Sequence, residues 1–140
     1  VSSQETSPSS LRFNNDGTRV FVLGYSSDSV YQYDLSTAYD ISSAQYNNVS
    51  FSVLGQDSRP TGLNFNNDGT KMYVCGTTTD DLYEYDLSTG FSVNSASYGS
   101  VKSPGSNVGG NPVSIMINKD GTKLYTVASS NDTVYRYTSN

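Results

Sequence analysis

Carboxylates are the side chains of this sequence that could do chemistry, because they recur in two sets at a spacing of 52 residues. Carboxylates that converge on one axis could hold a cation. The same residue type is common in tight turns, where Gly supplies a positive φ and Asp accepts hydrogen bonds from nearby N–H groups. We favour the turn interpretation and predict no metal site, since no loop of alternating acidic residues is present. The two sets are Asp16, Asp68 and Asp120, and Asp28, Asp80 and Asp132.

Other groups that usually carry catalysis are scarce. The chain has no His, which removes the commonest general base and the commonest metal ligand. Its single cysteine, Cys75, lies in an apolar run, and the residues 52 positions before and after it are Leu23 and Val127. We therefore expect Cys75 to be a small, buried hydrophobic side chain. A nucleophilic thiol would need a base such as His. We therefore predict no catalytic residue and no cofactor.

Binding is better sought where the copies differ than where they agree. The loops before the first apolar run of each copy, and those between the second and third runs, vary in sequence and are polar. Loops held on a rigid scaffold commonly carry binding, although drift in solvated loops would give the same variation. The candidate binding residues in these loops are Gln4, Glu5, Tyr25, Gln56, Asp57, Arg59 and Thr77.

Two sequons mark sites of modification. Asn48-Val-Ser and Asn131-Asp-Thr could each accept a glycan if the protein passes through a glycosylating secretory route. Chance sequons are expected in a chain so rich in Asn and Ser.

These residues would be positioned by a repeat of short strands. The Asn-Asp-Gly-Thr sequence at Asn15–Thr18 returns at Asn67–Thr70, and Asp-Gly-Thr returns at Asp120–Thr122. Each turn is flanked by short runs of Val, Tyr, Phe, Leu and Ile, bounded by Gly, Asn, Asp and Ser, which is typical of strands and hairpins. No helical periodicity of comparable length is present. Each copy is therefore predicted to be a four-stranded antiparallel meander.

The strands are apolar on both faces, which constrains how the copies pack. In the first copy Phe21 and Leu23 alternate with Val20 and Val22, so both faces of the sheet need cover. A repeat of about 50 residues with four strands is typical of the blades of a β-propeller. We predict an all-β propeller in one repeat domain over residues 1–140, with blades at about 1–52, 53–104 and 105–140. The last blade is predicted to lack its fourth strand.

A resemblance supports this fold. The segment NNDGTKMYVCGTTTDDLYEYDLST, residues 66–89, resembles the repeats of β-propellers found in environmental bacteria and their phages. It is also loosely similar to the YVTN-type repeats of surface proteins. The resemblance covers essentially the whole chain and implies a propeller, but it brings no catalytic motif with it.

Composition excludes some classes of partner. The net charge of −5 and the isoelectric point near 4.3 give no basic footprint for a phosphate backbone, so we expect no nucleic acid. No apolar run is long enough for a membrane span, so we expect no membrane insertion.

Blade number points to partners of another kind. Three blades are fewer than the roughly four to eight that close a ring. A homodimer could complete a six-bladed ring, further blades of a longer chain could do the same, and an open series of copies would form a filament.

We therefore expect a non-enzymatic module, extracellular or on a cell surface or virion, that self-assembles and binds a surface ligand such as a carbohydrate. One alternative is a purely structural assembly or filament module. A second alternative is a propeller hydrolase or lactonase.

Overall fold

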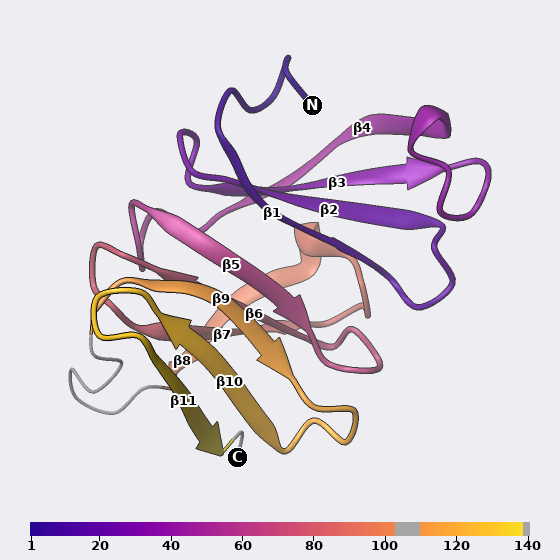
Figure 1. Ribbon diagram of the computed structural model, residues 1–140. Coiled ribbons are helices and arrows are strands. Elements are labelled where there is room, and N and C mark those ends of the chain that lie inside the picture. The colour runs from indigo at the N-terminus through magenta and orange to yellow at the C-terminus, as the bar shows by residue number, and fades with distance from the viewer. Residues whose placement is uncertain (103–109, 139–140) are drawn as a thin grey trace.

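The computed structural model describes residues 1–102 and 110–138, and these form three antiparallel sheets (Figure 1). The strands of each sheet pair in sequence order, and we call the sheets blade 1 (β1 to β4), blade 2 (β5 to β8) and blade 3 (β9 to β11). A 3-10 helix precedes the last strand of blades 1 and 2. The elements are β1 (Pro8–Phe13), β2 (Arg19–Gly24), β3 (Ser29–Leu35), η1 (Ile41–Ser43), β4 (Ala44–Ser52), β5 (Pro60–Phe65), β6 (Lys71–Gly76), β7 (Leu82–Leu87), η2 (Val93–Ser95), β8 (Ala96–Val101), β9 (Pro112–Ile117), β10 (Lys123–Ala128) and β11 (Thr133–Thr138).

The predicted meanders are confirmed. Blades 1 and 2 have four strands each, and blade 3 has three within the described residues. The sequence between blades 2 and 3, where the third copy departs most from the others, falls largely on 103–109, outside the described residues. No helix in the described part of the chain is long and apolar enough to cross a membrane.

The Asp-Gly-Thr sequences form the turns between the first and second strands. Asp16 accepts hydrogen bonds at one oxygen from the backbone N–H of Thr18, at 3.0 Å, and from its hydroxyl, at 2.6 Å. Gly17 has a φ of +73°, which costs an L side chain energy. The other two turns repeat these contacts. The turn interpretation of this carboxylate set therefore holds in all three blades.

The second carboxylate set closes the turns between the second and third strands. Asp28, Asp80 and Asp132 have φ values of +51°, +59° and +54°. Asp tolerates this left-handed conformation better than most residues, because its short side chain can bond locally. The spacing of these residues thus reports the geometry of the repeat.

The blades stack face to face, with β5 lying between β1 and β9 (Figure 1). We call the packing of blade 1 on blade 2 the first joint, and that of blade 2 on blade 3 the second joint. The first joint is a buried apolar cluster that includes Phe21, Leu23, Val30, Leu63, Phe65, Met72, Val74 and Tyr85. The second joint contains Tyr73, Cys75, Leu82, Ile115 and Leu124.

The first strands of the blades, β1, β5 and β9, lie side by side, and we call them the inner strands. Hydroxyl groups on these strands donate hydrogen bonds from one blade to the next. The Ser9 hydroxyl of blade 1 donates to the Pro60 carbonyl of blade 2, at 2.9 Å. At the equivalent position of blade 2, the Thr61 hydroxyl donates to the Pro112 carbonyl of blade 3, at 2.5 Å. Blade 3 has Val113 at this position, so the series of hydroxyls ends there.

Candidate functional site

Two of the predicted binding residues, Glu5 and Asp57, are buried. Glu5 accepts hydrogen bonds from the backbone N–H of Ser7, at 2.5 Å, and from the hydroxyl of Ser27, at 2.5 Å. Burial favours the neutral acid, but these hydrogen bonds outweigh it and lower the pKa of Glu5. Asp57 accepts from the N–H groups of Arg59, Thr78 and Thr79. Each carboxylate thus joins the loop before the first strand of its blade to the turn between the second and third strands, and binding through them stays a prediction.

The other predicted binding residues lie in the same loops but differ in accessibility. Gln4 and Gln56 are half-buried, and their side-chain oxygens accept from the hydroxyls of Tyr33 and Tyr85, each at 3.3 Å. The remaining three are more accessible, since Tyr25 and Arg59 are exposed and Thr77 is half-buried. The backbone N–H of Thr77 donates to the carbonyl of Arg59, which brings these two residues together.

A hollow lies at the opposite end of the inner strands. The predicted loops precede Pro8 at the start of β1, whereas the hollow is lined by Phe13 at its end and by Asn15 in the following turn. It has a volume of about 180 Å³ and takes residues from all three blades. Its polar side chains are five amides and one ammonium: Asn15, Asn64, Asn66, Asn67, Asn118 and Lys119. Its aromatic side chains are Phe13, Phe65 and Phe91.

Several of these amides are held in place by the turns. The side-chain oxygen of Asn66 accepts from the Lys71 N–H, at 2.9 Å, and Asn118 accepts in the same way from Lys123, at 2.8 Å. Asn64 donates to the Ile115 carbonyl of the neighbouring blade, at 3.3 Å. The polar lining is therefore organised before any ligand arrives.

A second hollow of about 230 Å³ adjoins the first, because the two share Asn66, Asn67 and Lys119. It adds the carboxylates of Asp68 and Asp120. Hydrogen bonds from the Thr that follows each of these carboxylates by two residues lower both pKa values, so both carboxylates are ionised at neutral pH. The site thus offers a cation, two carboxylates and several amides.

This arrangement can polarise a carbonyl and accept a proton. An ammonium or amide N–H near a carbonyl oxygen stabilises the negative charge that develops there, and a carboxylate can take a proton from an attacking water. Within the described residues no group of His, Cys, Asp and Glu is placed to hold a metal ion.

Sequence reasoning did not nominate this hollow. Its residues are parts of the repeated turns, and repetition alone assigned them to structure. One difference between the copies could have pointed to it. The third copy has Lys119 where the first two have Asn15 and Asn67, and Lys119 supplies the single ammonium that lines the hollow.

Comparison with known proteins identifies the fold. No protein-family model and no curated protein matches the sequence. Solved structures do match, with 95% of this chain covered in each of three examples. A proposed 6-phosphogluconolactonase from Bacteroides fragilis gives a TM-score of 0.72 at 12% identity over 35% of that chain. The periplasmic gluconolactonase of Pseudomonas aeruginosa gives 0.67 at 13% identity over 36% of its length. The β-propeller domain of Cps50 (Swd1) from Myceliophteria thermophila gives 0.67 at 12% identity over 38%.

The chain folds as blades of a β-propeller. The predicted fold class is confirmed by the sheets and by these likenesses, while no family model supports the particular repeat sequence that suggested it. The chain spans only 35–38% of the length of the solved propellers that it matches. At 12–13% identity the likeness establishes the fold alone.

The expectation of a non-enzymatic binding module requires correction. The solved propellers that this chain resembles include a proposed and a named lactonase, so the fold gives no support to the expectation that the module is non-enzymatic. The sequence argument gave weight to the absence of His, but carboxylates and Lys can also act as a general acid or base. A location outside the cytoplasm stays a prediction, as does glycosylation at Asn48 and Asn131, both of which are exposed.

Proposed function

We propose that this chain forms blades of a propeller hydrolase that opens the lactone of a sugar acid. The observation that carries the proposal is the hollow at the end of the inner strands, where amides from all three blades surround a volume of about 180 Å³ beside Lys119. The likeness to propellers described as lactonases supports the same class of reaction.

The lining of the hollow suits a single small polyol. Ligand pockets for drug-sized molecules are usually about 300–1,000 Å³, so this smaller volume favours a compact substrate. Amide groups can donate to and accept from hydroxyls, and the phenyl rings of Phe13, Phe65 and Phe91 can cover the C–H face of a sugar ring. These contacts would hold a lactone ring in a fixed orientation.

The proposed reaction uses water as the nucleophile. The Lys119 ammonium polarises the lactone carbonyl, and Asp68 or Asp120 accepts a proton as water attacks the carbonyl carbon. The tetrahedral oxyanion then collapses and the ring C–O bond breaks. The released alkoxide takes the proton back from the carboxylate, which leaves an open-chain hydroxy acid.

A proton-release assay tests this proposal, because opening a lactone forms an acid that ionises at neutral pH. Glucono-δ-lactone is the probe, and the uncatalysed rate in the same weak buffer is subtracted. We expect the chain to accelerate opening and Lys119→Gln to lower kcat/KM by about 100-fold, as for loss of one oxyanion donor. Arg59→Gln makes the same change of charge among the predicted binding residues at the opposite end of the strands, and it should leave kcat/KM unchanged because the proposed reaction takes place in the hollow. No acceleration by the native chain, or an equal effect of both variants, would refute the proposal.

A further inference from the structure

Three apolar side chains on the outer face of blade 1 are exposed at repeat positions that are fully buried in blade 2. Val1 and Leu11 are each 53% exposed and Ile41 is 57% exposed. The equivalent residues of blade 2, Val53, Leu63 and Val93, are 0% exposed and lie in the first joint. The outer face of blade 1 therefore has the composition of a joint without the opposing blade.

The outer face of blade 3 shows the complementary pattern. Val127 is 40% exposed and Val134 is 66% exposed. The residues equivalent to Val127 are Leu23 in blade 1 and Cys75 in blade 2, and those equivalent to Val134 are Val30 and Leu82. All four are 0% exposed and lie inside the joints. Blade 3 thus presents the face that each of the other blades presents to its successor.

The two open faces are both largely apolar. The outer face of blade 1 carries a hollow of about 430 Å³ lined by apolar side chains that include Val1, Leu11 and Ile41. In the first joint, the equivalents of these three residues pack in the same cluster as Phe21, Leu23 and Val30. Blade 3 has Tyr125, Val127 and Val134 at the positions of Phe21, Leu23 and Val30, so this part of its outer face is also mainly apolar.

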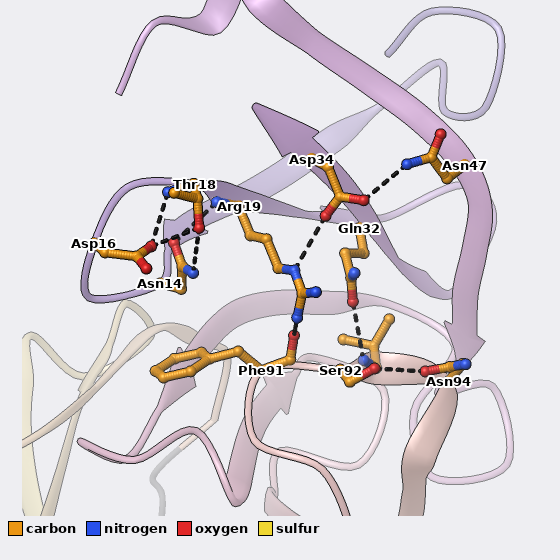
Figure 2. A network of polar contacts seen from close by, with 11 residues as sticks. Asn14, Asp16, Thr18, Arg19, Gln32, Asp34, Asn47, Phe91, Ser92 and Asn94 are labelled. Carbon is orange, nitrogen blue, oxygen red and sulfur yellow. Dashed lines mark hydrogen bonds and ion pairs between the residues drawn. The ribbon is translucent and has the colours of Figure 1, made fainter. Parts of the chain in front are cut away.

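Polar groups add a charge match in the same register. In the first joint the side-chain oxygen of Gln32 accepts from the backbone N–H of Val93, at 3.2 Å, next to the N-cap residue Ser92 (Figure 2). Blade 3 has Arg136 at the position of Gln32, and blade 1 has Asp40 at the position of Ser92. Only one oxygen of Asp40 receives the capping hydrogen bonds from Ser42. Docking blade 3 on blade 1 in this register brings a guanidinium to a carboxylate.

We propose that a second copy of this chain occupies these faces, with blade 3 of each copy docked on blade 1 of the other. A two-fold rotation then creates two identical joints and closes a ring of six blades, within the usual range for propellers. The two open faces lie at opposite ends of the three-blade stack, so the two faces of one copy do not contact each other. The inference does not depend on the proposed hydrolase activity.

The mass in solution tests the proposal directly. Sedimentation equilibrium of the native chain over a range of concentrations up to about 100 µM is expected to show a complex of twice 15.1 kDa. A mass of 15.1 kDa throughout would overturn the proposal, and so would an open-ended series of larger species.

Charge reversal tests the register. Asp40→Arg and Arg136→Asp should each weaken dimerisation about tenfold or more, because like charges then face each other. The double variant restores opposite charges across both joints and should recover dimerisation. Arg59→Asp lowers the net charge by two, as Arg136→Asp does, but in the loop between β4 and β5, and it should dimerise as the native chain does. Failure of the double variant to recover, with native circular dichroism in all variants, would refute the register.

Val134→Asp gives an independent measurement on the apolar part of the face. Val134 is 66% exposed in the single chain, so the substitution should leave the fold intact while the dimer dissociates. A folded Val134→Asp variant that still dimerises would show that blade 3 does not form the joint.

Discussion

Replacing Leu63 by Ala tests whether the blades are held by close packing at the joints. Leu63 lies on β5, is 0% exposed, and belongs to the apolar cluster of the first joint. Removing three buried carbons loses their transfer free energy and leaves a cavity between two sheets, because neither sheet can collapse without disturbing its own ladder. We expect Leu63→Ala to lower the free energy of unfolding by about 3 kcal/mol, within the roughly 2–5 kcal/mol seen for buried Leu.

Leu54 provides the matched control for this prediction. It is 57% exposed in the loop that leads into blade 2, so Leu54→Ala should change the free energy of unfolding by less than about 0.5 kcal/mol. Urea unfolding followed by far-ultraviolet circular dichroism and tyrosine fluorescence is the assay, since the chain has twelve Tyr and no Trp. All chains are compared at one dilute concentration. A loss below about 1 kcal/mol for Leu63→Ala, or equal losses for both variants, would show that the first joint is loosely packed.

Three further predictions follow from single residues. Burial and two neighbouring carboxylates raise the pKa of Asp28, so its ionised form destabilises the fold. Asp28→Asn should therefore raise the free energy of unfolding at pH 7, and the gain should vanish below the ordinary Asp pKa of 3.8, which urea unfolding at a pH on each side of that value would show. Burial raises the pKa of Cys75 to about 11, so iodoacetamide should label it only in urea; rapid labelling of the folded chain would contradict the burial. Gly69→Ala should lower the melting temperature more than Gly121→Ala. Both glycines have a positive φ, but of these two only Gly69 has a ring, that of Phe91, where an added Cβ would lie. Equal shifts in melting temperature would count against that contact.

Much of the fold could be predicted because the relevant physics is local and repeated. The Asp-Gly-Thr turns fix each hairpin through bonds two residues apart, as Asp16 and Thr18 show. Alternation of apolar residues on both sides of β2 predicted that both faces of the sheet need cover, and blade 2 covers one of them. The blade as a unit, and the stacking of blades, follow from these two facts.

The candidate site could not be predicted in the same way. Its lining combines ends of strands that are about one repeat apart in sequence, and only the stacking of three blades brings them together. The sequence could not predict that Asp57 is buried, since a polar loop residue can face the solvent or turn toward N–H groups of a neighbouring loop. Here Arg59 of the same loop and Thr78 and Thr79 of the turn between β6 and β7 all donate to the carboxylate, which turns inward.

The hydroxyls that join neighbouring blades bear on where the proposed dimer would open first. Ser9 and Thr61 each add a hydrogen bond to an internal joint, whereas a sheet that docks on blade 3 meets Val113. In the proposed dimer, the joint at that face would rely on apolar contact and charge alone. We therefore expect heat or mechanical load to separate the two copies before it separates the blades within one copy.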